Sequence, residues 1–122
     1  MTLVDTSVWI DFLRGREPIR EKMAVLLNEQ QVCSVECIFG ELLVGAKDRK
    51  EIGILESYWR NISKAPETDI WIEAGKLSSA MKLPSKGVGL IDAAILVAGR
   101  RANAVIWTLD EKLKGVLGKD SY

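Results

Sequence analysis

The sequence contains no histidine. This absence excludes Ser-His-Asp and Cys-His nucleophilic sites, imidazole general bases and nearly every metal site with nitrogen ligands. Only two cysteines are present, Cys33 and Cys37, with no further thiol or imidazole to complete a zinc site, so we expect both to be reduced core residues. If the chain is an enzyme, its chemistry must use carboxylates, hydroxyls, lysines or a bound cofactor.

The sequence also lacks an excess of charge and a long apolar run. Lysine plus arginine number 17, as do aspartate plus glutamate, so the formal net charge is zero. Proteins that coat nucleic acid nonspecifically usually have a basic excess, so any nucleic-acid contact here must come from local basic patches. No apolar run approaches the roughly 18 residues of a membrane span, and the N-terminus lacks the pattern of a signal peptide. We therefore expect a cytoplasmic protein that does not bind membranes.

The 122 residues, of which 48% are hydrophobic, fit a single domain spanning residues 1–122. Short apolar strands alternate with amphipathic helices, a pattern typical of an α/β protein with a parallel sheet. Thr6, Ser7 and Ser34 offer hydroxyls that can cap the helices after the first two strands. Strands are expected near residues 3–4, 31–34, 61–65 and 104–107. Helices are expected near residues 6–13, 18–28, 35–46, 49–59, 69–81, 90–102 and 111–117.

Two aspartates follow expected strands. Asp5 comes directly after Leu3 and Val4, and Asp110 comes soon after the strand that ends at Trp107. In α/β proteins, ligands and catalytic groups collect at this end of the strands because the rigid sheet holds the loops. The alternative for each aspartate is that it only ends a strand and caps the next helix.

Two further acids lie on expected helices. Asp92 is the only acid in the apolar helix 90–102, which we expect to be buried. An unpaired buried carboxylate is costly unless it is protonated, hydrogen-bonded or coordinated to a cation. Glu41 falls at the border of the apolar stripe of its own helix, at the edge of the core. The alternatives are an acid that stabilises a helix start, for Asp92, and a solvated surface residue, for Glu41.

In a parallel sheet with right-handed crossovers, the strand-to-helix junctions open onto one edge, so Asp5, Asp92 and Asp110 can converge there. Glu41 can lean in from its helix. Carboxylates within ~4–6 Å raise one another's pKa, and a divalent cation is the usual compensation. Oxygen ligands alone select a hard ion, Mg²⁺ or Mn²⁺. This arrangement favours phosphoryl transfer or phosphodiester hydrolysis by a metal-activated water.

Four short motifs carry a more specific signal: Val4-Asp-Thr-Ser-Val-Trp-Ile-Asp11, Gly40-Glu-Leu-Leu-Val-Gly45, Leu90-Ile-Asp-Ala-Ala-Ile95 and Trp107-Thr-Leu-Asp110. In this order and at these spacings they resemble the PIN-domain family and, more narrowly, the VapC-type toxins of prokaryotic toxin–antitoxin pairs. Any one motif is weak, but the four together span nearly the whole chain. The resemblance implies a three-layer α/β/α fold with a central parallel sheet of four to five short strands.

The resemblance also implies an activity, a cofactor and partners. The implied activity is endonucleolytic cleavage of RNA, often tRNA or rRNA, that leaves a 5′-phosphate and depends on Mg²⁺ or Mn²⁺ in an acidic pocket. The implied partners are a second copy in a homodimer and an antitoxin whose tail inserts a basic side chain into the pocket. Position by position, the residues that match the family are the acids Asp5, Glu41, Asp92 and Asp110 and the hydroxyl residues Thr6, Ser7 and Thr108.

We expect Asp5 and Asp92 to be the direct metal ligands, with the other two acids completing the cage or orienting water. Lys112 stands where many relatives carry a further acid, so the outer metal site is expected to be weaker. Formation of a fifth strand near the C-terminal end stays open. Two other functions remain. A phosphatase with Asp5 as nucleophile would want an acid where this chain has Ser7, and a catalytically silent PIN-like module would bind RNA or protein without using the acids.

Overall fold

The computed structural model describes residues 1–122 and contains a sheet of four parallel strands in the order β3-β2-β1-β4. In the middle of the sheet, Leu3 pairs with Cys33 on one side and with Ile106 on the other. The predicted parallel sheet is therefore confirmed, and every strand ends at the same edge. The strands are β1 (Thr2–Val4), β2 (Val32–Ser34), β3 (Ser63–Lys64) and β4 (Val105–Trp107).

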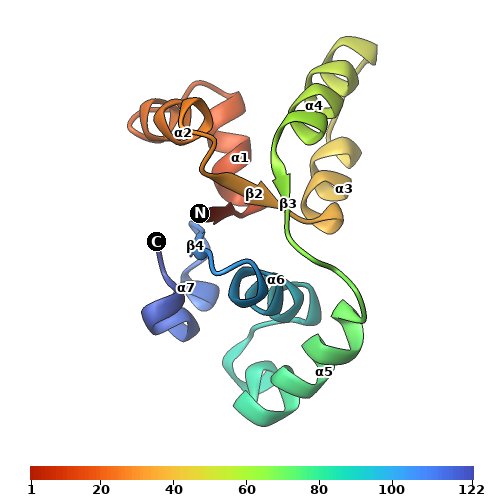
Figure 1. Cartoon of the computed structure of the whole chain (residues 1–122), viewed down its shortest axis with the longest axis vertical. Coiled ribbons are helices and arrows are strands. Elements are labelled where there is room, and N and C mark those ends of the chain that lie inside the picture. Colours follow the sequence, from red (N-terminus) through yellow and green to blue (C-terminus); the bar gives the residue numbers. More distant parts are fainter.

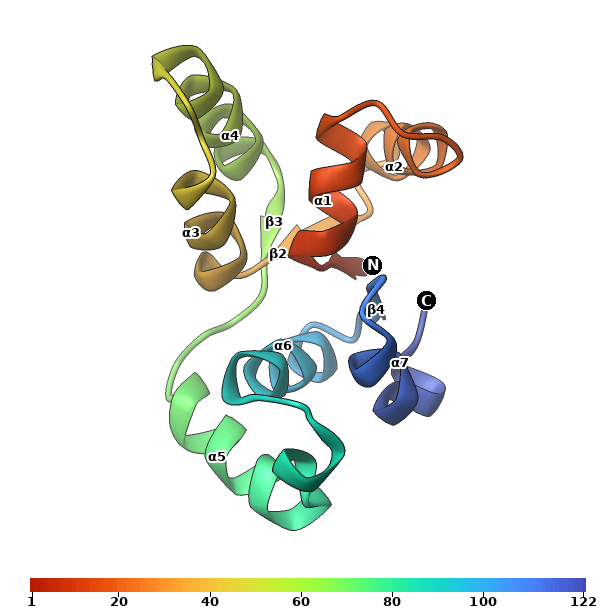
Figure 2. The ribbon, with the colours of Figure 1, turned by 180° about the vertical axis from the view of Figure 1, so that it is seen from behind.

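Helices cover both faces of the sheet, which gives the predicted three layers (Figure 1). The first four helices lie on one side of the sheet and the last three on the other, as the view from behind also shows (Figure 2). The α-helices are α1 (Thr6–Leu13), α2 (Ile19–Asn28), α3 (Glu36–Val44), α4 (Arg49–Asn61), α5 (Ile70–Met81), α6 (Leu90–Arg101) and α7 (Glu111–Leu117). None of them is long and apolar enough to cross a membrane.

The core forms between the sheet and these two helical layers. Trp9 of α1 is fully buried and meets Phe39 of α3 and Tyr58 of α4 edge to face. On the other side of the sheet, α6 approaches β4 closely at Gly99, where a Cβ atom would lie 3.0 Å from two side-chain carbons of Ile106. This close contact ties the C-terminal part of α6, the helix that carries Asp92, to the middle of β4.

The structure differs from the sequence expectations at several element ends. Thr6 and Ser7 do not cap α1, and Ser34 does not cap α3, because Ser34 is the buried last residue of β2. The backbone N–H of Glu36, at the start of α3, instead donates to the carboxylate of Glu67 at 3.0 Å. The segment expected as a loop at 82–89 contains a 3₁₀ turn, Leu83–Lys86.

No full fifth strand forms. A single parallel bridge joins Ser121 to Ile106 at the outer side of β4, and the backbone N–H of Tyr122 donates to the carbonyl of Ile106 at 2.9 Å. The ring of Tyr122 stacks on Trp107, with 4.8 Å between the ring centroids. The C-terminal residues therefore cover the edge of β4 without extending the sheet by a strand.

Both cysteines are free thiols, as predicted. Cys33 is buried in β2, whereas Cys37, on α3, is only half-buried. Burial raises the pKa of Cys37 to about 11, and the negative charges of Glu41 and Glu67 add to the effect. Cys37 is consequently protonated at neutral pH, and a protonated thiol is neither a nucleophile nor a metal ligand.

Candidate active site

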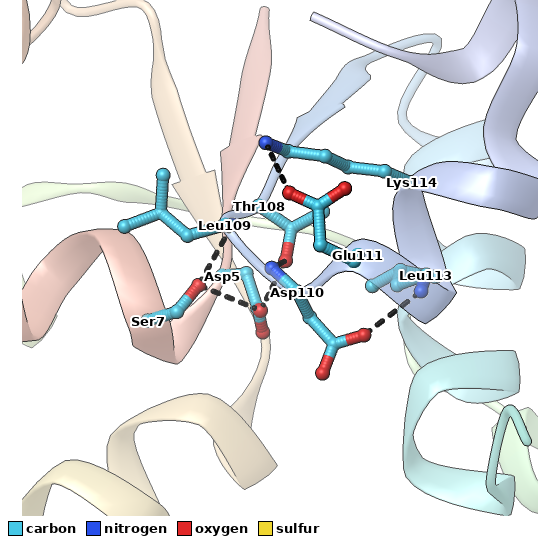
Figure 3. Close-up of polar contacts among 8 residues, drawn as sticks. All are labelled: Asp5, Ser7, Thr108, Leu109, Asp110, Glu111, Leu113 and Lys114. Carbon is cyan, nitrogen blue, oxygen red and sulfur yellow. Dashed lines mark hydrogen bonds and ion pairs between the residues drawn. The ribbon is translucent and has the colours of Figure 1, made fainter.

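Asp5 lies at the junction between β1 and α1, and it is only 8% exposed. Its backbone N–H donates to the carbonyl of Trp107 at 2.9 Å, which continues the pairing with β4 beyond the last residue of β1. The hydroxyls of Thr108 and Ser7 donate to its Oδ2 atom at 2.7 and 3.1 Å (Figure 3). Because both bonds end on Oδ2, the Oδ1 atom of Asp5 keeps its lone pairs free for a ligand.

The segment between β4 and α7 is tied to the same two hydroxyls. Ser7 accepts from the backbone N–H of Leu109 at 3.0 Å, and Thr108 accepts from that of Asp110 at 3.1 Å. Asp110 caps α7 by accepting from the backbone N–H of Leu113 at 2.9 Å (Figure 3). The capping alternative for Asp110 is thus correct, but it occupies only Oδ1, and the Oδ2 atom stays free.

Glu41 lies on α3 and contacts the start of α1. The hydroxyl of Thr6 donates to its Oε1 atom at 2.9 Å, so Thr6 and Ser7, adjacent in sequence, orient two different acids. Glu67 helps to place this helix because it accepts from the backbone N–H of Glu36. Sequence patterns gave no sign of this contact, since Glu67 belongs to no motif and lies 31 residues from Glu36.

Asp92 lies in the first turn of α6 and is half-buried. Burial raises its pKa, and the negative charges of Asp5, Asp110 and Glu41 raise it further. The four acids therefore interact electrostatically although they come from four separate elements. We call Asp5, Glu41, Asp92 and Asp110 the acidic site.

The comparisons with known proteins show the family of this chain. The family profile of the PIN domain matches residues 2–118 of the sequence. The chain belongs to the PIN-domain family. This assignment confirms the resemblance inferred from the four motifs.

One sequence relative and two solved structures resemble this chain over most of its length. A protein named Ribonuclease VapC32 from Mycobacterium tuberculosis is 29% identical over 119 residues, which cover 93% of this chain and 88% of the relative. A toxin–antitoxin complex from Klebsiella pneumoniae contains a similar fold, with a TM-score of 0.74, 20% identity and coverage of 97% and 94% of the two chains. VapBC2 from Rickettsia felis, solved with a DNA fragment from its promoter, matches with a TM-score of 0.68, 15% identity and coverage of 93% and 91%.

The acidic site of this PIN domain forms no ion pair within the chain. No lysine or arginine forms an ion pair with any of the four acids. The carboxylates interact electrostatically, but no three of them lie close enough together to form a preformed metal site. That arrangement fits Mg²⁺, which is usually held by one or two carboxylates together with waters and substrate phosphates. All the available donor atoms are oxygens, and oxygen ligands favour a hard ion such as Mg²⁺ or Mn²⁺.

All seven residues singled out from the sequence lie at or beside the predicted sheet edge, but the hydrogen bonds of two of them differ from the prediction. Thr6 and Ser7 were expected to cap a helix and instead hold carboxylates. Glu41 was weighed as a solvated residue, and its side chain is exposed, but Thr6 fixes it toward α1. The roles of these residues in metal binding and catalysis remain predictions.

The raised pKa of Asp92 leads to a prediction about stability. A carboxyl group whose folded pKa is raised stabilises the fold below its ordinary value of 3.8, and this contribution is lost as pH rises through the folded pKa. At neutral pH and without metal, charged Asp92 therefore costs stability. Asp92→Asn is expected to raise the midpoint of thermal unfolding in EDTA at about pH 7, and the gain should shrink toward about pH 4.

Glu73→Gln provides the control for this measurement. Glu73 also lies in the first turn of a twelve-residue helix, but it is paired with Lys76 at the surface. We expect no gain in stability from that change. A lower midpoint for Asp92→Asn at neutral pH would show that the repulsion inferred for the acidic site does not operate.

Proposed function

We propose that this PIN domain is a Mg²⁺- or Mn²⁺-dependent endoribonuclease and the toxin of a toxin–antitoxin pair. The observation that carries the proposal is the gathering of four carboxylates at one sheet edge without an ion pair to a lysine or arginine of the chain. A relative is named Ribonuclease VapC32, and one structural neighbour is a toxin–antitoxin complex. RNA supplies the phosphates that complete the coordination of such an ion.

The residues of the site have different roles in the proposed hydrolysis. A bound divalent ion would lower the pKa of a water and offset the charge that develops on the phosphate. The free Oδ1 of Asp5 and the carboxylate of Asp92 would hold that ion. Glu41 and Asp110 would contact the ion through water or accept a hydrogen bond from the attacking water.

The hydroxyl residues keep the carboxylates in position. Thr108 and Ser7 donate to one oxygen of Asp5, so the other oxygen is presented in a fixed direction. Thr6 does the same for Glu41. Partners of metal-ligating groups typically affect metal affinity or activity by about 10- to 100-fold. These three side chains are therefore positioning residues in the proposed mechanism.

The proposal also covers the partners. The structural neighbour from Klebsiella pneumoniae is a toxin–antitoxin complex, which supports a cognate antitoxin for this protein. A basic side chain of the antitoxin would neutralise the acidic site and so compete with the metal ion. We further propose a homodimer, a cytoplasmic location, and tRNA or rRNA as the substrate.

The function is tested by incubating the purified chain with total bacterial RNA in Mn²⁺ or in EDTA and sequencing the new RNA ends. We expect discrete internal cuts with 5′-phosphate ends in Mn²⁺ and none in EDTA. Identical end profiles in the two conditions would remove the nuclease proposal. RNA that is bound in both conditions but never cut would favour the catalytically silent binding module.

A further inference from the structure

Lys112 lies across the backbone of Gly87. A Cβ atom at Gly87 would stand 2.9 Å from Cδ, 3.3 Å from Cε and 3.4 Å from Nζ of Lys112, so the lysine stem occupies space that only glycine leaves open. Gly87 has a φ of +75°, a conformation that also favours glycine. The backbone at Gly87 therefore forms a seat for this one side chain.

This seat lies at the border of the acidic site. Lys112 comes two residues after Asp110, and Gly87 comes shortly before the first turn of α6, where Asp92 lies. The lysine stem thus bridges the two chain segments that carry these acids. Its ammonium group nevertheless forms no ion pair with either of them.

Nothing in the chain uses the charge of Lys112. Its ammonium group makes no hydrogen bond and no ion pair, whereas Lys114, on the same helix, pairs with Glu111 at 3.6 Å (Figure 3). Lys112 also lies in the first turn of α7, where the helix dipole disfavours a positive charge. Lys112 thus lies at the border of the site, has no ion pair and is unfavourable for its own helix. Its charge is therefore suited to an anionic ligand from outside the chain.

We propose that Lys112 binds a phosphate of the RNA backbone next to the phosphate that is cleaved. This inference rests on the proposed function, because it names how the same site holds its substrate. The chemistry fits, since an ammonium group acts as a point charge for phosphate, and backbone contacts position nucleic acid without reading its sequence. The seat on Gly87 holds the stem before RNA arrives, which reduces the entropy lost on binding.

The proposal is tested with a single-stranded RNA oligonucleotide that contains a mapped cleavage site. Lys112→Ala is expected to raise KM about two- to fivefold and to change kcat by less than about twofold, because the contact is made equally in the ground state and the transition state. The plot of log(kcat/KM) against log salt should become less steep by about 0.7, the value for one phosphate contact on a single strand. Lys112→Arg should restore the KM, since it keeps the charge.

Lys114→Ala is the matched control, because its ammonium group is paired with Glu111 on the same helix. It is expected to leave KM and the salt dependence unchanged. Equal values for Lys112→Ala and Lys114→Ala, or a fall in kcat with an unchanged KM, would overturn the role of Lys112 while the nuclease assignment stands. A wild-type chain that neither binds nor cuts the oligonucleotide would overturn both.

Discussion

Replacing Asp5 with asparagine is expected to lower RNA cleavage at least about a hundredfold. Partners of metal-ligating groups already cost about 10- to 100-fold when they are removed, and Asp5 is the acid that two such partners hold. Asparagine keeps the shape of the side chain but removes the negative charge, so the fold should survive and the metal ion should be lost. The measurement is the initial rate of oligonucleotide cleavage in Mn²⁺.

Two further variants make this experiment decisive. Thr108→Val removes one donor to Asp5 and is expected to give an intermediate loss of about tenfold or more. Asp11→Asn, on the same helix as the Asp5 junction but paired with Arg16 at 3.6 Å, should keep the wild-type rate. An Asp5→Asn variant as active as Asp11→Asn would show that Asp5 does not hold the ion.

Replacing Trp9 with alanine is expected to lower the free energy of unfolding by about 3–5 kcal/mol. Trp9 is fully buried, and its ring meets Phe12, Phe39 and Tyr58 edge to face at centroid distances of 5.9, 5.1 and 5.3 Å. The cavity would remove contacts among α1, α3 and α4 at once. For a chain of this size the midpoint of thermal unfolding should fall by roughly 10–20 °C.

The same change should disturb the acidic site from a distance. Trp9 lies one turn after Asp5 on α1, and Phe39 lies two residues before Glu41 on α3. The contact between the two rings therefore helps to set the spacing of α1 and α3, which the hydrogen bond from Thr6 to Glu41 spans. Trp71→Ala is the control, because its side chain is 48% exposed, and it should shift the midpoint by only a few degrees. Equal shifts for the two variants would contradict this account of the core.

Trp9→Phe is expected to cost less than Trp9→Ala in the same experiment. Phenylalanine keeps an aromatic ring in the cluster, and it removes an indole N–H that is buried without a hydrogen-bond partner. An unsatisfied buried donor carries a desolvation cost, so its loss offsets part of the packing that is given up.

The fold was predictable because its signals are local. Alternation of strands and helices predicted the parallel sheet. The element ends were less predictable because distant contacts decide them. Glu67 caps α3 in place of Ser34, and a single bridge at Ser121 replaces a fifth strand. Neither contact leaves a pattern in the residues near it.

The candidate site was predictable for its acids and less so for its hydroxyls. A strand-to-helix junction places an acid such as Asp5 at the sheet edge whatever the details of the loop. The direction of a short side chain depends on what lies opposite in three dimensions. Thr6 and Ser7 looked like caps because capping is the local use of a hydroxyl, but the carboxylates of Glu41 and Asp5 lie within reach and accept instead.

Calorimetric titration of Mn²⁺ into the purified chain measures whether the acidic site binds a divalent ion. The wild-type chain is expected to bind Mn²⁺ in a saturable way, whereas Asp5→Asn should show no saturable binding under the same conditions, with Asp11→Asn unchanged. If the wild-type chain takes up no Mn²⁺, or if the Asp5→Asn chain binds it as tightly as the wild type, the acidic site does not hold the ion through Asp5.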